Sequence, residues 1–267
     1  KIYDVVIVGA GPAGIFAALE LVQTGKKLSI LIIDKGLAID KRACISRVRN
    51  MSCNNCVPCA TMCGWGGAGA FSDGKLTLST EVGGSLDEYI GEQALAGLID
   101  YVDRIYLEFG APERIYGLEN TEAIQEVQRQ AVQAELKLIP VRIRHMGTGR
   151  CQDILQRMYE HLISRGVEVA TSTSVAQVLV ENGAVQGVAC DNGQVFRAKQ
   201  VVLAPGRIGA EWLSAEAHRL GLETAVNPVD IGVRVEVPAA IMDKLTSIFY
   251  EAKFVYYSKS FNDKVRT

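Results

Sequence analysis

Residues 2–34 read I-Y-D-V-V-I-V (2–8), then G-A-G-P-A-G (9–14), then an apolar run to Gln23, and finally L-S-I-L-I-I-D (28–34). The pattern predicts a strand, a glycine turn, a helix and a second strand that ends in an acid. A unit of this kind, with three glycines at this spacing, is typical of a domain that holds a dinucleotide.

The three glycines each have a physical reason. Gly9 permits a tight turn out of the first strand, and Gly11 leaves space for a pyrophosphate to approach the backbone. Gly14 lets the helix pack closely on the strand. The alternative is a glycine-rich turn in an α/β protein of another kind, but the flanking strand, helix and acid favour the dinucleotide site.

The helix that begins at Pro12 and Ala13 offers backbone N–H groups and a partial positive charge to phosphates. Asp34 lies 20 residues past Gly14, where a carboxylate can accept hydrogen bonds from a ribose 2′-OH. An acid at this position disfavours a 2′-phosphate and therefore NADP. The adjacent Lys35 completes this set of candidate cofactor-binding residues.

Composition sets wider limits on the protein. A chain of 267 residues with 48% hydrophobic residues predicts one large or two moderate globular domains. A net charge of −2 gives no electrostatic reason to expect nucleic acid or an anionic membrane as a partner. The least charged run, residues 5–19, is too short to span a bilayer, so we expect no transmembrane segment. Seven clustered cysteines favour a reducing compartment, and we expect a cytoplasmic protein.

The later elements include a predicted antiparallel meander. Asn182-Gly183 and Asn192-Gly193 are hairpin turns that join strands expected at 174–180, 184–189 and 195–197. Periodicity and breakers predict the remaining elements: helices at 86–109, 120–136, 152–165, 210–220 and 239–246, and strands at 137–143, 167–170, 201–204 and 231–237.

A parallel β-α-β start followed by a meander resembles the two-dinucleotide-binding-domain flavoproteins of the glutathione-reductase-like superfamily. Residues 200–207, Q-V-V-L-A-P-G-R, resemble its second fingerprint, with Pro205 in place of the usual Thr. The resemblance implies that Ala204, Pro205 and Gly206 run near FAD. It also implies that Val175 lies on the strand that lines the adenine, although packing alone would also explain a valine there.

A more specific resemblance rests on residues 64–76, G-W-G-G-A-G-A-F-S-D-G-K-L, together with 145–148 (H-M-G-T) and 232–236 (G-V-R-V-E). These segments resemble a family of bacterial and archaeal FAD-dependent dehydrogenases over nearly the whole chain. The resemblance implies an FAD-dependent oxidoreductase of unknown small-molecule substrate and a chain that is truncated at its C-terminus. Backbone N–H groups of the loop Gly66, Gly67, Ala68 and Gly69 would then face the flavin or its pyrophosphate.

We therefore expect an α/β fold with a Rossmann-like FAD-binding domain, built from a parallel sheet plus an antiparallel β-meander, over residues 1–85 and 146–221. A partial second α+β substrate domain would comprise residues 86–145 and 222–267, and the flavin ring would point towards it. Only one G-x-G-x-x-G, at residues 9–14, follows a predicted strand and opens a predicted helix. Electrons would therefore come from transiently bound NAD(P)H or from a protein electron donor.

The Cys-rich loop, residues 44–64, carries a second strong pattern. Cys53, Cys56, Cys59 and Cys63 have the spacing of a bacterial ferredoxin run, with Gly64 where the usual proline would follow. They could hold a [4Fe–4S] cluster, with Cys63 or Cys44 as the fourth ligand. A structural zinc, redox-active thiols beside the flavin and inert thiols are the alternatives that the sequence leaves open.

Other polar and cysteine residues are less specific. The basic stretch of Lys41, Arg42, Arg47 and Arg49 could dock an anionic substrate, an NAD(P)H phosphate or an acidic donor, or form a solvated face. His145 and His161 are candidates for acid–base work, with a capping or core role favoured, and we name no catalytic residue. Cys151 and Cys190 are expected to be small buried hydrophobes. The alternative functions are a non-catalytic FAD-bound or nucleotide-sensing protein and a flavin/thiol disulfide-type reductase.

Overall fold

The structure is a computed structural model that describes residues 1–266 except 73, 118, 148, 227–228 and 230. Asp73 and Thr148, which belong to the motifs quoted above, lie outside the described residues. The chain divides into two compact units: unit 1, Lys1–Gly74 with Thr148–Asn227, and unit 2, Lys75–Gly147 with Pro228–Thr267. Residues 75–85, expected in the first domain, therefore group with unit 2.

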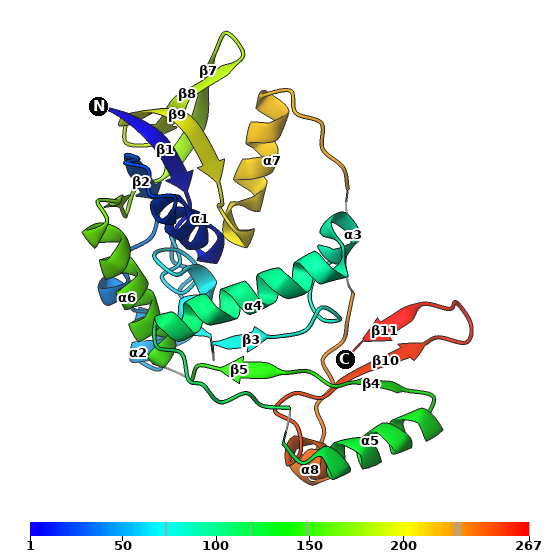
Figure 1. Cartoon of the computed structure of the whole chain (residues 1–267). Coiled ribbons are helices and arrows are strands. Elements are labelled where there is room, and N and C mark those ends of the chain that lie inside the picture. The colour runs from blue at the N-terminus through cyan, green and yellow to red at the C-terminus, as the bar shows by residue number, and fades with distance from the viewer. Residues whose placement is uncertain (73, 118, 148, 227–228, 230, 267) are drawn as a thin grey trace. The chain divides into compact units, whose positions relative to one another are not determined.

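Unit 1 is built on a six-stranded sheet with the order β6-β2-β1-β9-β8-β7. β6, β2, β1 and β9 are parallel, and β9, β8 and β7 form an antiparallel meander. Figure 1 shows β1 and β2 in blue and the meander in yellow-green to yellow. The fold class predicted from the sequence is thus confirmed. The strand bounds are Ile2–Val8 (β1), Ile30–Ile33 (β2), Glu168–Ala170 (β6), Val175–Glu181 (β7), Ala184–Cys190 (β8) and Val195–Leu203 (β9).

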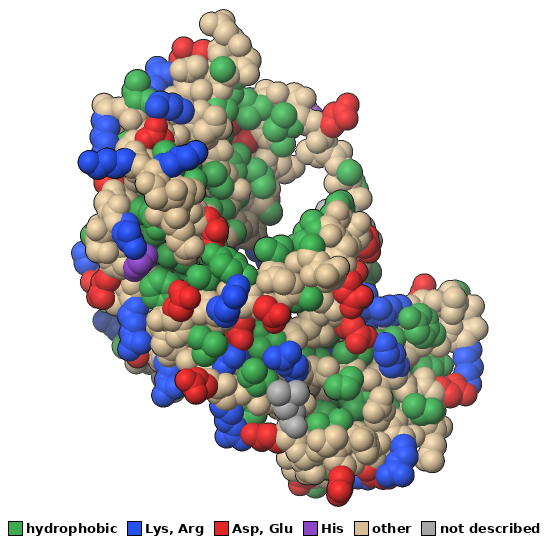
Figure 2. Space-filling view, in the orientation of Figure 1, with side chains coloured by type: hydrophobic (Ala, Val, Ile, Leu, Met, Phe, Trp, Pro, Cys, Tyr) green, Lys and Arg blue, Asp and Glu red, His purple; other side chains and the backbone are tan. Residues whose placement is uncertain are grey.

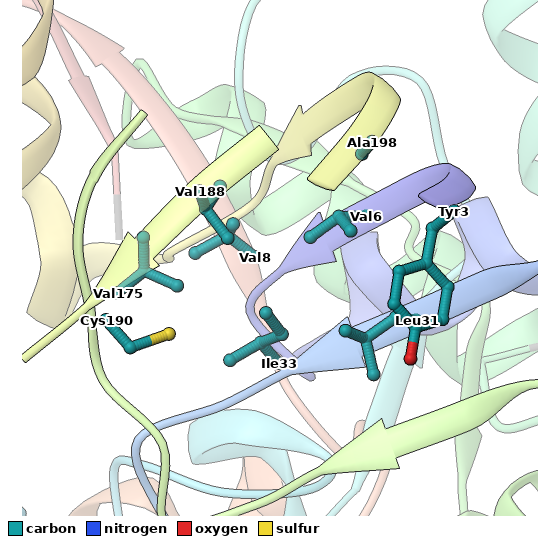
Figure 3. Packing of buried hydrophobic residues seen from close by; sticks show 9 residues of the cluster. All are labelled: Tyr3, Val6, Val8, Leu31, Ile33, Val175, Val188, Cys190 and Ala198. Atoms are coloured by element: carbon teal, nitrogen blue, oxygen red, sulfur yellow. The ribbon is translucent and has the colours of Figure 1, made fainter. Parts of the chain in front are cut away.

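The central strands are apolar on both faces because both faces are covered. β1 pairs with β2 so that Val6 lies opposite Leu31 and Val8 opposite Ile33. Figure 3 shows these four side chains in one cluster with residues of β7, β8 and β9. Ile7 points to the other face, towards α1, because successive side chains alternate along a strand. Continuous apolar runs are expected for such parallel strands.

The helices of unit 1 follow the predicted periodicity. The α-helices are Pro12–Gln23 (α1), Ile45–Val48 (α2), Arg150–Ser164 (α6) and Ala210–Arg219 (α7), and the short 3-10 helices are Ile39–Lys41 (η1), Gly67–Phe71 (η2) and Arg207–Gly209 (η3). In α6 the predicted apolar face is buried, with Met158 and Leu162 fully covered.

Unit 2 contains two smaller sheets and four helices among its described residues. Its strands are Lys75–Thr77 (β3), Lys137–Ile139 (β4), Ile143–His145 (β5), Lys253–Tyr257 (β10) and Lys264–Arg266 (β11), and its helices are Asp87–Ile90 (α3), Glu92–Glu108 (α4), Thr121–Gln133 (α5) and Ala239–Thr246 (α8). β11, β10 and β4 form one sheet, and β3 pairs with β5. Ile124 and Val127 of α5 pack with Leu138 of β4 and with Phe249 to form a local core.

Five predicted elements need correction. The strand expected over 137–143 is two strands, because Pro140 lacks the N–H that a continuous ladder requires. The strands expected at 195–197 and 201–204 are one strand, β9, because β1 and β8 between them supply partners along much of its length. The helix expected at 86–109 is interrupted at Gly91, which has a φ of +80°. The strand expected at 231–237 is wrong, since these exposed residues have no partner strand among the described residues.

The surface carries charges of both signs. Figure 2 shows basic and acidic side chains interspersed over the visible face, in keeping with the small net charge of −2. In the part of the chain that the structure describes, no helix has both the length and the apolar character that a membrane crossing requires.

Candidate functional site

Unit 1 contains a cavity of about 350 Å³ at the carboxyl ends of β1, β2 and β9. Twelve residues predicted to lie at the cofactor line this cavity: Gly9, Gly11, Pro12, Asp34, Lys35, Gly67, Ala68, Gly69, Val175, Ala204, Pro205 and Gly206. The remaining predicted residues, Ala13, Gly14 and Gly66, do not line it. The strand ends of an open parallel sheet are the usual place for a ligand site in α/β folds.

The glycine turn is shaped by close backbone contacts. Gly9 has a φ of +109°, and a Cβ there would lie 2.1 Å from the carbonyl oxygen of Ala204. A Cβ at Gly14 would lie 1.9 Å from the carbonyl oxygen of Gly9. A Cβ at Gly11 would meet nothing within 4 Å, because Gly11 borders the open cavity. Two glycines are thus needed for packing, and the third keeps the cavity clear.

The N-terminus of α1 borders the cavity through Gly11 and Pro12. No side chain caps this helix end, and its first turn contains no acidic residue. Uncapped N–H groups and the positive end of the helix dipole are suited to bind an anionic group. This part of the cavity therefore fits a phosphate or pyrophosphate.

Asp34 has a structural role that the sequence did not reveal. Its carboxylate accepts hydrogen bonds from the backbone N–H groups of Ala10 at 2.8 Å, Gly36 at 2.7 Å and Gly64 at 2.8 Å. An ionised carboxylate has about four acceptor positions, so most of its capacity is taken by the backbone. Asp34 joins the glycine turn to the segment after the cysteines, and its contact with a ribose stays a prediction.

Arg42 corrects the interpretation of the basic stretch. Its side chain is buried and donates to the carbonyl oxygens of Trp65 at 2.6 Å, Gly67 at 2.8 Å, and Ala60 and Thr61 both at 3.0 Å. Burial lowers the pKa of Arg42, which the nearby Asp34 carboxylate opposes. Arg42 therefore holds the loop that follows the cysteines and does not dock a partner. The other basic residues of this stretch are exposed: Lys41, Arg47 and Arg49.

The loop predicted to face the cofactor is held against the glycine turn. The backbone N–H of Gly66 donates to the carbonyl oxygen of Ala10 at 2.7 Å. A Cβ at Gly67 would lie 3.1 Å from the Cα of Gly11, so the two backbones approach closely. Together with the Arg42 bonds, these contacts fix Gly67 and Ala68 in the wall of the cavity.

The cysteines do not converge on one centre. Cys53 and Cys56 are exposed, Cys44 and Cys59 are half-buried, and Cys63 is buried in the wall of the cavity. Among the described residues, no three His, Cys, Asp or Glu side chains are arranged to hold a metal ion. In this arrangement the thiols do not fit an iron–sulfur cluster or a Cys₄ zinc site, both of which need converging sulfurs.

The thiols nearest the cavity differ in chemistry. A hydrogen bond between the Cys59 thiol and Thr61 Oγ1, at 3.1 Å, is the main cause of a lowered pKa for Cys59. Burial raises the pKa of Cys63. Cys151 in α6 and Cys190 in β8 are both buried, and burial raises the pKa of each thiol.

The candidate histidines lie in different units. His145 ends β5 in unit 2, where its ring centroid lies 4.7 Å from that of Tyr250 and 6.4 Å from that of Tyr116. His145 Nε2 is buried and has no hydrogen-bond partner in the described part of the chain. His161 lies in the last turn of α6. Neither lines the cavity of unit 1.

Several lining residues were missed. They are Val8, Ile33, Met62, Thr173, Ser174, Arg207, Ile208, Gly209 and Trp212, with Cys63 predicted only as a metal ligand. Most follow strands whose ends were identified, so the order of the sheet could have placed them. Trp212 carries no local signal beyond its position in the helix that follows β9.

Comparison with known proteins identifies FAD binding domains in this chain. A family model described as an FAD binding domain matches residues 105–239, which are 135 of the 267 residues, and a second FAD binding domain model matches residues 2–55. An uncharacterised protein of Clostridium beijerinckii is 26% identical over 244 residues, which cover 89% of this chain and 37% of that protein.

A second relative is the tRNA uridine 5-carboxymethylaminomethyl modification enzyme MnmG of Caldicellulosiruptor saccharolyticus, 29% identical over 76% of this chain and 24% of that enzyme. The chain thus spans about a quarter to a third of the length of these relatives. The structure of 3-ketosteroid-Δ4-(5α)-dehydrogenase from Rhodococcus jostii has a TM-score of 0.51 and 19% identity, over 82% of this chain and 49% of that one. That likeness supports the fold, and on the family match over half its length the chain belongs to the family of FAD binding domains.

Proposed function

We propose that this chain is the FAD-binding part of an FAD-dependent oxidoreductase that acts on a small-molecule substrate. The observation that carries the proposal is the cavity of unit 1, where the glycine turn, the end of β9 and the loop at Gly67 meet. Resemblance to the glutathione-reductase-like superfamily adds support, because the meander and the A-P-G segment after β9 match its pattern.

The residues of the cavity suggest how the cofactor is held. Gly11 and the uncapped N-terminus of α1 would receive the pyrophosphate, and Ala204 to Gly206 would run beside it. Asp34 and Arg42 would keep the surrounding backbone in place through the bonds described above. When bound, FAD supplies the electron acceptor for substrate oxidation or the donor for reduction, and the protein supplies position and exclusion of water.

The source or destination of electrons outside the flavin is a further part of the proposal. With one dinucleotide turn in this chain, NAD(P)H would bind transiently, or a protein would exchange electrons with the flavin. We do not route electrons through an iron–sulfur cluster, because the thiols do not fit one in this arrangement.

The test is identification of the bound nucleotide. The purified chain is denatured by heat, and the released compound is identified by chromatography, with calorimetric titration of FAD if none is retained. FAD and ADP should bind, whereas FMN, which lacks the ADP half, should bind at least tenfold more weakly. Recovery of NAD, or binding of FMN as tight as that of FAD, would overturn the proposal.

A flavin/thiol disulfide-type reductase is the second candidate, because Cys63 lies in the wall of the cavity and Cys59 has a lowered pKa. Addition of a dithiol to the FAD-loaded protein should then reduce the flavin anaerobically, and Cys63→Ser should prevent this. A bound flavin that neither a dithiol nor NAD(P)H reduces would favour the non-catalytic, nucleotide-sensing alternative.

A further inference from the structure

Helix α7 is fastened to the outer edge of the sheet by three side chains on one of its faces. Trp212 Nε1 donates to the carbonyl oxygen of Ala176 at 2.8 Å. Glu216 accepts from the backbone N–H of Val178 at 3.0 Å, and Arg219 donates to the carbonyl oxygen of Val178 at 2.6 Å. Positions 212, 216 and 219 follow the spacing of a single helix face.

These bonds satisfy backbone groups that an edge strand would otherwise leave open. β7 is the last strand of the six-stranded sheet, so one side of it has no neighbouring strand. Side chains from a covering helix are one way in which proteins protect such an edge. Because bonds from Trp212 and from Arg219, seven residues further along α7, both hold the helix on β7, the Trp212 ring has a fixed position without a bound ligand.

The fixed ring lies in the wall of the cavity. Trp212 is half-buried, packs against the core cluster that contains Val175, and lines the cavity together with Val175. An aromatic face and a branched aliphatic side chain are suited to a flat, uncharged ring. The glycine turn and the α1 N-terminus line the same cavity with backbone N–H groups, which are suited to phosphates.

We propose that Trp212 is a nucleobase-binding residue, against which the purine base of the cofactor packs. The inference rests on the proposed FAD function and adds to it a residue that neither the family match nor the glycine pattern identifies. Trp212 would have two roles, since its N–H fastens α7 to β7 while its ring receives the base. Stacking of a base on an aromatic side chain contributes about 5- to 150-fold to affinity.

The experiment uses ADP as the probe, because ADP has the purine base and pyrophosphate without a flavin that would absorb tryptophan emission. The chain has two tryptophans, and Trp65 is fully buried with its Nε1 bonded to the carbonyl oxygen of Leu155 at 2.8 Å. ADP should therefore quench the emission of Trp212 in a saturable way. Trp212→Phe should abolish the quenching, while calorimetry still detects ADP with less than about a fivefold loss of affinity.

Trp212→Ala should weaken ADP binding by about tenfold or more, with inorganic pyrophosphate binding unchanged. Leu213→Ala is the matched control, because Leu213 lies next to Trp212 on α7 but does not line the cavity, and it should bind ADP as the wild type does. If Trp212→Ala does not fold, the Trp212→Phe fluorescence decides the question.

Full quenching by ADP in Trp212→Phe would overturn the inference, as would wild-type ADP affinity in Trp212→Ala. Equal losses for ADP and pyrophosphate in Trp212→Ala would also overturn it, since they would show that Trp212 only supports the fold. If the wild-type chain binds neither ADP nor FAD, the proposed function fails as well, so the two failures are distinguishable.

Discussion

The glycine turn at residues 9–14 and the Cys-rich loop at residues 44–64 have equally regular spacings, but the structure treats them differently. In the glycine turn, the packing around Gly9 and Gly14 is made by the chain itself. In the Cys-rich loop, two predicted metal ligands are exposed and a third is buried elsewhere. The glycine spacing has a structural reason in contacts within the chain, so it can be interpreted without a ligand. Cysteines spaced to bind a metal converge only when the metal is bound.

The largest effect is expected inside the glycine turn. Gly14→Ala would place a Cβ only 1.9 Å from the carbonyl oxygen of Gly9. Because this distance is far below van der Waals contact, β1 and α1 must move apart. We expect a loss of about 4 kcal/mol in the free energy of unfolding, measured by urea denaturation. Gly11→Ala is the control and should unfold like the wild type, because its Cβ would meet nothing within 4 Å. Equal stability of the two variants would contradict this account of the turn.

Arg42→Met should have the next largest effect, because the Arg42 side chain joins the Cys-rich loop to the segment that follows it. The substitution leaves the buried carbonyl oxygen of Trp65 and the half-buried carbonyl oxygen of Gly67 without their donor. The expected loss is about 3 kcal/mol in the free energy of unfolding. The exposed neighbour gives a matched control, and Lys41→Met should change stability by less than about 0.5 kcal/mol. A similar result for both variants would mean that Arg42 is not a structural donor.

Gly11→Val separates binding from folding. The added methyl groups would enter the cavity where the pyrophosphate is expected, so FAD and ADP affinities should fall about a hundredfold, or about 2.8 kcal/mol. The urea midpoint should stay close to that of the wild type, because the backbone φ of −77° is open to any residue. Normal FAD stoichiometry in this variant would show that the phosphates lie elsewhere.

Serine substitutions in the Cys-rich loop should have small effects. Cys53→Ser and Cys56→Ser change exposed side chains and should cost less than about 0.5 kcal/mol, whereas Cys63→Ser puts a hydroxyl in a buried position and should cost about 1–2 kcal/mol. Iron, sulfide and zinc are measured in anaerobically purified protein alongside. If the wild-type protein contains stoichiometric metal and any one of these serine variants lacks it, the contrast drawn between the two regions is wrong, because the loop would then assemble around a metal.

The thiols of Cys59 and Cys63 should differ in their rate of alkylation, which is measured on the folded protein. The Thr61 hydrogen bond lowers the pKa of Cys59, and a thiolate reacts faster than a thiol, whereas Cys63 is buried with a raised pKa. Iodoacetamide at neutral pH should therefore label Cys59 well before Cys63, as peptide mass spectrometry would show. Thr61→Val should slow the labelling of Cys59, and saturating ADP should further protect Cys63 if the cavity is the nucleotide site.

Local patterns allowed much of the fold to be predicted. The Asn-Gly pairs at 182 and 192 mark the two hairpins that join β7, β8 and β9. Asn182-Gly183 is a two-residue turn, whereas the second hairpin closes over residues 191–193, where the N–H of Gly193 donates to the carbonyl oxygen of Cys190. The errors in the predicted elements arise where the structure depends on contacts between segments distant in the sequence. Residues 231–237 alternate like a strand but find no partner among the described residues, and polar Lys199 and Gln200 continue β9 because β1 pairs beside them.

The site shows the same division. Gly9, Gly11 and Asp34 could be placed at the cavity because they belong to one continuous β-α-β unit. The bonds of Asp34 to Gly64, and of Arg42 to the loop beyond the cysteines, depend on how distant segments meet, which no spacing records. Trp212 was missed for the same reason, since its position follows from the bonds between α7 and β7.

The Asp34 carboxylate has a consequence for local opening. Its three backbone donors come from the glycine turn, from the residues just after β2 and from a position 30 residues further along the chain. Opening any one of these segments exposes a shared acceptor, so the three should behave as one cooperative unit in amide exchange. Phosphate bound at the glycine turn would then slow amide hydrogen exchange at Gly64. Chemical modification of the loop before Gly64 would in turn speed amide exchange in the glycine turn. One carboxylate would thus couple the opening of the Cys-rich loop to occupancy of the proposed nucleotide site.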